Sequence, residues 1–215
     1  MLIKGVIFDL DGVITDTAEG HYKAWEKLAD EIGVSISREF NEGLKGLSRE
    51  DSLELILKQN NKSSNYTNDE KINLLDKKNK YYLNWISNLS KEDILPGVVV
   101  LLKKLKNADI KIGLASASKN APLILEKLDL TSLFDIIANP ELVSKGKPDP
   151  GIFLLAAKEL NLQTKNCVGI EDSSAGIKAI NDAGMYSIGV GNFDYLKEAN
   201  CNVNSLIEID LKNIL

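Results

Sequence analysis

The chain has very little cysteine and histidine: two cysteines and one histidine in 215 residues. Cys167 and Cys201 are isolated and form no CxxC pair, which excludes a disulfide framework or a thiolate metal site and is typical of a reducing compartment. No apolar run approaches the roughly 20 residues that cross a bilayer. The first residues, MLIKGVIFDL, lack the charged, apolar and small segments of a secretory signal. We therefore expect a cytoplasmic protein with no membrane partner.

An excess of positive charge is also missing. Lys and Arg number 26 against 31 Asp and Glu, so the formal net charge is −5, which argues against a nucleic acid or an anionic membrane as the main partner. No GxGxxG follows the first apolar run, which excludes a nicotinamide-binding protein of the usual kind. With 44% hydrophobic and 27% charged residues, the composition is that of an ordinary globular chain with one sizeable domain, or one domain and an insert.

Short apolar runs alternate with helical patterns over most of the chain. After a first run beginning at Val6, the expected strands are Lys111–Ala115, Phe134–Ala138, Asn166–Ile170 and Tyr186–Val190. The expected helices are Gly97–Lys106, Ala121–Leu128, Gly151–Leu160 and Ser174–Ala183. This alternation predicts an α/β fold with a Rossmann-like parallel sheet covered by helices on both faces.

Residues 17–89 break this rhythm, because they contain helical periodicity and no strand candidate. One helix face is marked by residues at steps of three and four, apolar or aromatic except for Asn79: Ile72, Leu75, Asn79, Tyr82, Ile86 and Leu89. Two capping boxes, Ser48–Asp51 and Thr67–Glu70, indicate helix starts, and Lys58–Asn68 is interpreted as a loop. We therefore expect a helical cap domain, 17–89, inserted into a catalytic core made of residues 1–16 and 90–215.

Two pairs of acidic residues stand where strands are expected to end. The stretch VIFDLDGVI places Asp9 and Asp11 two positions apart, on one side of an extended chain, and GIEDSSAG ends another strand with Glu171 and Asp172. A single acid pair is more often a helix cap or a solvated turn. Two pairs at the carboxyl ends of parallel strands, where α/β sheets bind ligands, favour a hard-oxygen site for Mg²⁺.

Two further motifs suggest phosphate binding. In LASASKN a strand ends in small hydroxyl residues before a helix, an arrangement that receives anions, although serine and asparagine also cap helices everywhere. In KGKPDP, Lys145 or Lys147 can supply a point charge to a phosphate, although a basic turn beside proline is usually solvated surface.

Taken together, FDLDGV, a strand-terminal Ser, a Lys before PDP and GIEDS resemble the haloacid dehalogenase superfamily of phosphotransferases. The longer strings FDLDGVITDTAEGHYKAW, LKGLSREDSLELIL, LASASKNAPLILEKL and GIEDSSAGIKAINDAG are similar to its sugar-phosphate mutases. The resemblance covers most of the chain and is weakest from Lys58 to Lys71 and after Val190.

The resemblance implies a role for each matching core residue. Asp9 is expected to be the nucleophile that carries the phosphoryl group, and Asp11 the general acid and base. Mg²⁺ is expected to bind Asp9, the backbone carbonyl of Asp11 and Asp172, with Glu171 as a ligand or close neighbour. Ser116 and Lys147 are expected to hold the transferred phosphoryl group. Backbone amides come from Ala117 and its neighbours, Lys119 included.

The resemblance also implies roles in the cap. Gly46, Leu47 and Ser48 are expected to line the sugar and Arg49 to bind the second phosphate, which Ser118 and Asn120 meet from the core. Lys78 is expected to contact the sugar, although the alignment is loose and Lys77 remains possible. His21 and Thr17 match hinge residues, although His21 is also compatible with a surface position beside Trp25. Gly20 is unusual so early in a helix and suggests a looser segment.

The expected activity is a Mg²⁺-dependent phosphomutase acting on small sugar phosphates. It would interconvert β-D-glucose 1-phosphate and glucose 6-phosphate through a bisphosphorylated sugar, as a monomer. A sugar-phosphate phosphatase on the same fold is the first alternative. A binding module switched by an aspartyl phosphate is the second, and Asp11 and the large insert argue against it.

Overall fold

The computed structural model describes residues 2–44, 47–191 and 193–210. The chain divides into two compact units: Met1–Asp16 with Ser90–Leu215, called here the sheet unit, and Thr17–Leu89, called the helical unit. Within the described residues, no helix combines the length and apolar character that a membrane crossing requires.

One sheet organises the sheet unit. In the described part of the chain it contains six strands in the order β3-β2-β1-β4-β5-β6, and every neighbouring pair is parallel. The strands are β1 (Gly5–Phe8), β2 (Lys111–Leu114), β3 (Ile136–Ile137), β4 (Cys167–Glu171), β5 (Tyr186–Val190) and β6 (Cys201–Val203). The predicted α/β parallel sheet is confirmed.

The edges of the sheet differ most from the prediction. The run expected as a five-residue strand at Phe134–Ala138 forms only the two-residue β3, and β6 was not expected at all. Edge strands are commonly short because they pair on one side only. The sequence CNV of β6 also lacks the continuous apolar character by which the central strands are recognised.

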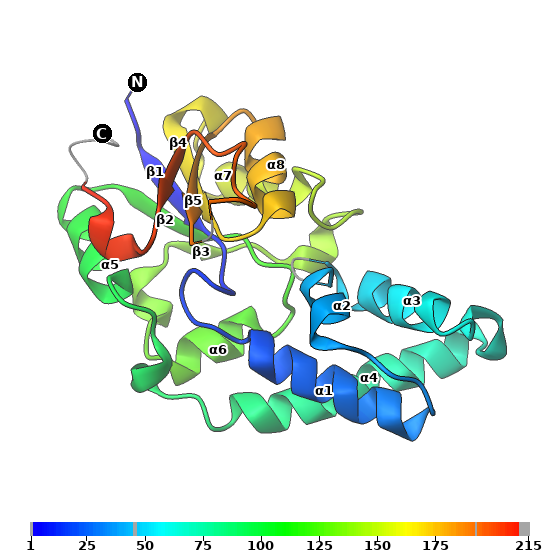
Figure 1. Ribbon diagram of the computed structural model, residues 1–215. Helices are drawn as coiled ribbons and strands as arrows, with labels where there is room; N and C mark the ends of the chain where they lie inside the picture. The colour runs from blue at the N-terminus through cyan, green and yellow to red at the C-terminus, as the bar shows by residue number, and fades with distance from the viewer. Residues whose placement is uncertain (1, 45–46, 192, 211–215) are drawn as a thin grey trace. The chain divides into compact units, whose positions relative to one another are not determined.

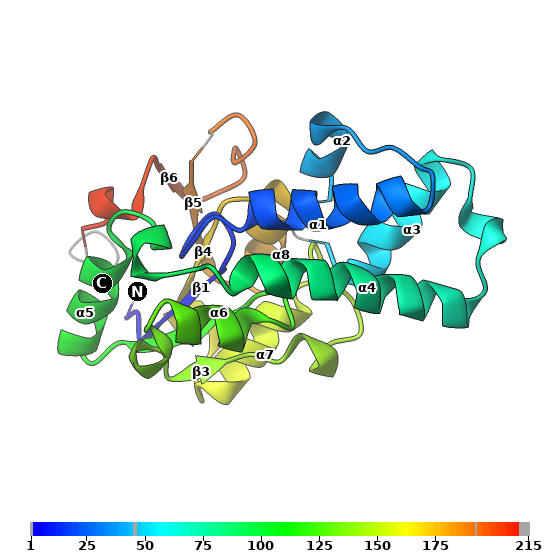
Figure 2. The same ribbon diagram turned by 90° about the horizontal axis from the view of Figure 1, so that it is seen from below.

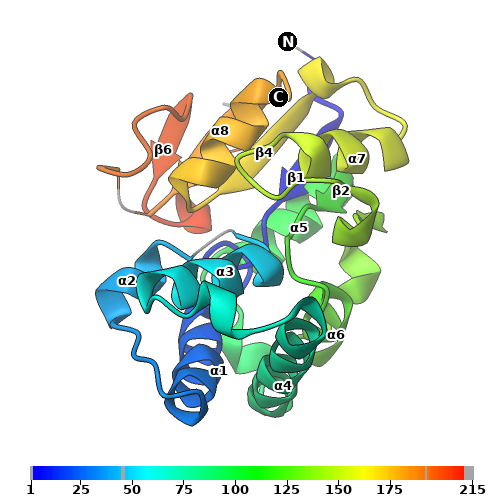
Figure 3. The same ribbon diagram turned by 90° about the vertical axis from the view of Figure 1, so that its right-hand side faces the viewer.

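Helices cover both faces of this sheet. Figure 1 shows α7 (Gly151–Glu159) and α8 (Ser174–Asp182) on one face and α5 (Val98–Asn107) on the other; Figure 3 shows α8 running along β4. Ile7 of β1 packs into the cluster under α7 and α8, whereas its neighbour Phe8 meets Phe134 edge-on, at a centroid distance of 6.2 Å. Both faces of β1 are buried, which explains why the strand is apolar throughout.

The register of the central strands brings their ends to one level. Phe8 of β1 pairs with Leu114 of β2 and with Ile170 of β4. The residues that follow, Asp9, Ala115 and Glu171, therefore emerge together at the carboxyl edge of the sheet. This is where α/β sheets bind ligands.

The helical unit contains α1 (Ala18–Glu31), α2 (Arg38–Glu42), α3 (Arg49–Gln59) and α4 (Asn68–Ile86). Figure 2 shows α1 and α4 lying side by side, and α3 also contacts α4. Its apolar core joins α1 and α3 through Trp25, Leu28, Leu53, Ile56 and Leu57. The apolar faces predicted by the helical periodicity therefore pack against one another.

Helix starts in this unit follow the predicted caps. Thr67 and Glu70 form a reciprocal capping box at α4, and the Ser48 hydroxyl accepts a hydrogen bond from the Asp51 N–H at α3. The loop expected at Lys58–Asn68 is shorter than predicted, since α3 continues to Gln59. Helix α2 was not predicted.

The remaining short helices are α6 (Ala121–Lys127) and the 3₁₀ turns Ser63–Asn65, Lys91–Asp93, Thr131–Leu133, Pro140–Leu142, Thr164–Asn166 and Leu206–Glu208.

Candidate active site

Asp9 is a buried carboxylate directly after β1, and its N–H donates to the Ile170 carbonyl at 2.9 Å. The strand ends at Phe8, so the sequence argument that Asp9 and Asp11 share one face of a strand is wrong in detail. Both residues lie beyond the strand, Asp11 in an isolated bridge with Thr15, and Leu10 between them is buried. Asp11 is half-buried, and its charge contributes to raising the pKa of Asp9.

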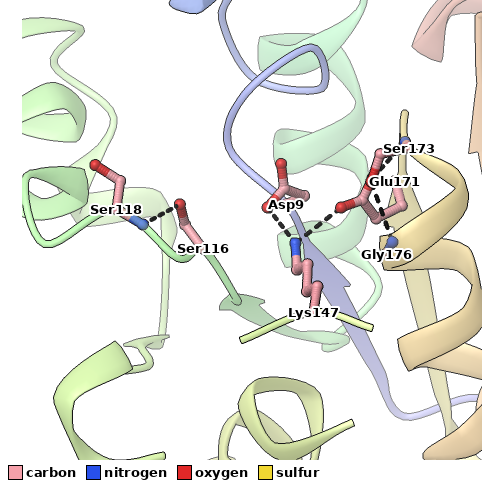
Figure 4. A network of polar contacts seen from close by, with 7 residues as sticks. All are labelled: Asp9, Ser116, Ser118, Lys147, Glu171, Ser173 and Gly176. Carbon is pink, nitrogen blue, oxygen red and sulfur yellow. Dashed lines mark hydrogen bonds and ion pairs between the residues drawn. The ribbon is translucent and has the colours of Figure 1, made fainter. Parts of the chain in front are cut away.

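Lys147 lies between two carboxylates. Its Nζ is 2.5 Å from Oδ1 of Asp9 and 2.8 Å from Oε1 of Glu171, and all three side chains are buried (Figure 4). Burial alone would lower the pKa of Lys147, but the neighbouring carboxylates outweigh it and raise the pKa, so the ammonium stays charged. Lys145, the other lysine considered in KGKPDP, is exposed.

Asp9, Glu171 and Asp172 form an acidic cluster. Each offers a ligand oxygen, and these oxygens lie within 4.8 Å of one another. Burial raises the pKa of Asp9 to about 7, opposed by Lys147 and reinforced by Glu171 and Asp11. Burial likewise raises the pKa of Asp172 to about 9, with Glu171 and Asp9 adding to it. Buried carboxylates that repel one another are a donor set suited to a hard divalent cation.

Two glycines let these carboxylates approach the backbone. Gly12 has φ of 73°, and a Cβ there would collide with the Asp172 carboxylate. A Cβ on Gly176, in α8, would collide with the carboxylate of Glu171. Oε2 of this carboxylate accepts a hydrogen bond from the Ser173 N–H at 2.6 Å. No role was expected for Gly176, although it stands five residues after Glu171 in GIEDSSAG. The close approach of these backbones supports the fit of the cluster to a metal ion.

The serine-rich loop after β2 lies at the same edge of the sheet. Ser116 is buried, and its hydroxyl accepts from the Ser118 N–H at 3.1 Å; the Ser118 hydroxyl accepts from the Asn120 N–H at 3.3 Å (Figure 4 shows the first contact). Ala117 is half-buried, whereas the Lys119 side chain is exposed and pairs with Glu141 at 3.1 Å. The loop therefore presents hydroxyls and backbone rather than the Lys119 ammonium.

In the helical unit, the structure brings His21 and Lys78 together. Nζ of Lys78 lies 2.9 Å from Nδ1 of His21, and the Lys78 side chain is only 1% exposed. The ammonium lies over the rings of Trp25 and Tyr82, at 4.8 and 4.7 Å from their centroids. Since a charged ammonium can only donate, Nδ1 of His21 is the acceptor. Nothing in the local sequence pattern indicated that Trp25 and Tyr82 enclose this lysine.

Burial lowers the pKa of His21 well below its usual value, and the charges of Lys78 and Arg49 lower it further. Arg49 therefore belongs to the same electrostatic group in the helical unit. Lys77, the alternative to Lys78 as the lysine that contacts the sugar, is not supported, because it pairs with Glu31 at 2.5 Å on the surface. The alternative interpretation of His21, as a surface residue beside Trp25 without a functional role, does not fit its contact with Lys78.

The remaining predicted residues of the helical unit are distributed around the starts of α1 and α3. Thr17 is buried, and its carbonyl accepts from the His21 N–H at 2.9 Å. Leu47 and Ser48 are half-buried, and the Ser48 hydroxyl is engaged at the start of α3 with Asp51. Gly46 lies outside the described residues.

Known proteins match this chain over nearly its whole length. Residues 3–184 match the family model described as haloacid dehalogenase-like hydrolase. The chain belongs to the haloacid dehalogenase-like hydrolase family.

Within the haloacid dehalogenase-like family, two β-phosphoglucomutases are close relatives. The one from Bacillus subtilis strain 168 is 49% identical over 98% of this chain and 93% of its own length. The crystal structure of one from Clostridium difficile is also 49% identical, with a TM-score of 0.97 over 99% of this chain and 96% of that one. A phosphorylated carbohydrates phosphatase from Thermotoga maritima is 30% identical over 86% of this chain and 84% of its own.

Haloacid dehalogenase-like enzymes use a divalent metal ion, and the acidic cluster of Asp9, Glu171 and Asp172 provides the oxygen donors for one. The family match also argues against the binding-module alternative, because the matched family model describes hydrolases and the matched relatives are enzymes. Phosphoryl transfer is left as the chemistry to explain.

Proposed function

We propose that this chain is a Mg²⁺-dependent β-phosphoglucomutase, which interconverts β-D-glucose 1-phosphate and D-glucose 6-phosphate. The observation that carries the proposal is the 49% identity over 98% of the chain to the Bacillus subtilis β-phosphoglucomutase, together with a buried Asp9 held by Lys147. Fold alone would not decide the activity, because related folds host different reactions.

In the proposed cycle, Asp9 starts as an aspartyl phosphate. Asp11 removes the proton of the sugar 6-hydroxyl while that oxygen attacks phosphorus, which releases the Asp9 carboxylate and forms β-glucose 1,6-bisphosphate. The bisphosphate then reverses its orientation in the site, so that its O1 phosphate faces Asp9. Asp9 attacks the phosphorus on O1, and Asp11 returns its proton to O1 as the P–O1 bond breaks. Glucose 6-phosphate leaves, and the phosphoenzyme is restored.

The charges around Asp9 suit this chemistry. A carboxylate attacking a phosphate dianion is opposed by electrostatic repulsion, which Lys147 offsets at 2.5 Å from Oδ1. We assign the Ser116 hydroxyl and the amides of Ala117 and Lys119 to the oxygens of the transferred phosphoryl group. The divalent ion, proposed to be Mg²⁺ on Asp9, Asp172, the Asp11 carbonyl and Glu171, would neutralise further negative charge on that group.

The helical unit is proposed to act as a cap that supplies sugar recognition and excludes water from the aspartyl phosphate. Arg49 is assigned to the distal phosphate, with Ser118 and Asn120 from the sheet unit. Lys78 is assigned to the sugar, as are Gly46, Leu47 and Ser48. His21 and Thr17 are assigned to the coupling of cap closure to Asp11.

A sugar-phosphate phosphatase is the second candidate, favoured by the 30% identity to the Thermotoga maritima enzyme. It would use the same Asp9, with water in place of the sugar hydroxyl. The test is a coupled assay with β-glucose 1-phosphate, Mg²⁺ and a trace of β-glucose 1,6-bisphosphate, with α-glucose 1-phosphate as the control. Glucose 6-phosphate formed from the β anomer alone, and lost with EDTA, supports the mutase. No glucose 6-phosphate from either anomer contradicts it.

A further inference from the structure

Gly20 is a glycine that the backbone itself does not require. It is the third residue of α1, it is buried, and its φ is not positive, so conformational freedom does not explain it. Glycine is among the poorest helix formers, and every other residue except proline would favour the helix more. The reason for glycine is therefore sought in the space around it.

That space is occupied by Trp85 of α4. A Cβ built on Gly20 would lie 2.9 Å from Cε2 of Trp85 and nearer still to Cδ2 and Cε3. These atoms belong to the flat face of the indole, and a real Cβ does not approach carbon so closely. The indole thus rests on the backbone of α1, at the point where a side chain would otherwise stand. The expectation that Gly20 loosens the segment is replaced by a packing role.

The contact continues to the His21 imidazole through a column of rings. Trp85 stacks on Tyr82, one helical turn before it on α4, with 5° between the ring planes and 6.2 Å between centroids. Tyr82 in turn lies against His21, at a centroid distance of 4.0 Å. Two consecutive residues of α1, Gly20 and His21, are therefore covered by two stacked rings of α4.

Lys78 lies on the same face of α4, four residues before Tyr82, and approaches Nδ1 of His21. The imidazole is thus held on its face by Tyr82 and at Nδ1 by Lys78. Both contacts depend on the spacing between the first turn of α1 and α4, and the three atoms nearest to a Cβ built on Gly20 all belong to the indole of Trp85. A change of a few tenths of an ångström there would be transmitted to His21, because packed interiors leave no slack.

We propose that Gly20 and Trp85 form a spacer that sets the distance between α1 and α4 and so positions the His21 imidazole on Lys78 and Tyr82. Both are positioning residues rather than catalytic ones. The inference rests on the proposed function and deepens it. In that function, His21 couples closure of the helical unit to Asp11.

The test uses the fact that His21 is the only histidine of the chain, so that one imidazole reports by NMR without assignment. Gly20→Ala is expected to shift the imidazole ¹⁵N resonances of the full-length protein. It is also expected to move the pKa of His21 upward towards 6.5, as water replaces the packed ring beside Lys78 and Arg49, the charged groups that face it. The mutase kcat/KM is expected to fall about 10-fold.

The second variant relieves the clash. In Gly20→Ala/Trp85→Leu the added methyl meets no indole, so the His21 resonances are expected to lie nearer the wild-type positions than those of Gly20→Ala. Should Gly20→Ala fail to fold, Trp85→Leu alone is expected to shift them, because Tyr82 loses its stacking partner. Gly43→Ala is the matched control, since its added methyl meets the Phe40 carbonyl oxygen only at 3.3 Å; it is expected to leave the resonances unchanged.

The proposal is overturned if neither Gly20→Ala nor Trp85→Leu moves the His21 resonances. It is also overturned if the His21 resonances of the double variant lie no nearer to the wild-type positions than those of Gly20→Ala. The NMR readout does not depend on activity. A wild-type protein without mutase activity would therefore contradict the proposed function, while the imidazole shifts would still decide the spacer.

Discussion

The ammonium of Lys147 lies 2.5 Å from the Asp9 carboxylate, although the two residues are 138 positions apart in the chain. Both are buried at the carboxyl edge of the sheet, where water cannot screen their charges. The pair gives Asp9 a fixed direction and a compensating charge before any phosphate arrives. As a carboxylate, such a nucleophile attacks phosphorus directly and needs no separate general base.

Asp9→Asn is expected to abolish phosphoryl transfer, because an amide oxygen cannot form the aspartyl phosphate. We expect the mutase kcat to fall by at least about 10³-fold while the fold is retained. Steady-state rates with highly purified protein check this, and Asp76→Asn, the same change at an exposed position, is the control. Turnover of Asp9→Asn within about tenfold of wild type would contradict the covalent mechanism.

Gly176→Ala tests the close packing under the acidic cluster. In an ordinary helix this change would stabilise the protein by about 0.5–1 kcal/mol. Here the new Cβ overlaps the Glu171 carboxylate, so we expect lower thermal stability and a higher Mg²⁺ concentration for half-maximal activity.

Gly151→Ala in α7 is the control for this change, because a Cβ there would lie 3.0 Å from its nearest atom, Oδ1 of Asp149, a close contact rather than the overlap that a Cβ on Gly176 would make with Glu171. It should leave the Mg²⁺ requirement unaltered. A stabilised Gly176→Ala enzyme with the wild-type Mg²⁺ requirement would show that this contact is unimportant.

The raised pKa values of Asp9, about 7, and Asp172, about 9, make metal-free stability depend on pH. Between the usual value of 3.8 and these values, the folded protein binds protons that the unfolded chain has released. The metal-free protein should therefore lose stability as the pH rises through this window.

A bound cation takes the place of those protons, so Mg²⁺ should raise Tm more at about pH 8 than at about pH 6. Thermal melts with Mg²⁺ or EDTA at both pH values measure the difference. Asp172→Asn should reduce the Mg²⁺ effect at both. An equal or larger Mg²⁺ shift at the lower pH would rule out these carboxylates as the ligands.

Arg49→Ala should separate sugar recognition from the chemical step. The mutase rate is expected to fall at least about tenfold, because the distal phosphate loses a charge-assisted partner, whereas hydrolysis of a small aryl phosphate should change by less than about twofold. Arg38→Ala, which removes a guanidinium paired with Glu19 on the surface, should affect neither rate. Parallel losses in both assays would remove Arg49 from distal phosphate binding.

The sheet and the edge that carries the site could be predicted because the central strands are buried on both faces and therefore apolar throughout. Asp9 and the pair Glu171–Asp172 interrupt that pattern at the strand ends, which makes them visible in the sequence. The short strand β6 carries no such pattern; among the described residues it lies at the edge of the sheet and pairs with β5. Helix α2, at five residues, is too short for its periodicity to stand out.

Other features depend on contacts between distant residues and could not be read locally. Which lysine of KGKPDP turns inward is decided by Asp9 and Glu171, far away in the chain. The enclosure of Lys78 depends on Trp25 of another helix. Gly20 looked like a weakness in α1 because its partner, Trp85, is 65 positions later.

The most direct test of the central claim compares two products of one reaction. Purified protein is supplied with β-glucose 1-phosphate, Mg²⁺ and a trace of β-glucose 1,6-bisphosphate, and glucose 6-phosphate and inorganic phosphate are followed side by side. A mutase would form glucose 6-phosphate much faster than inorganic phosphate. Release of inorganic phosphate at a rate equal to or above that of glucose 6-phosphate would contradict the mutase proposal and identify a phosphatase.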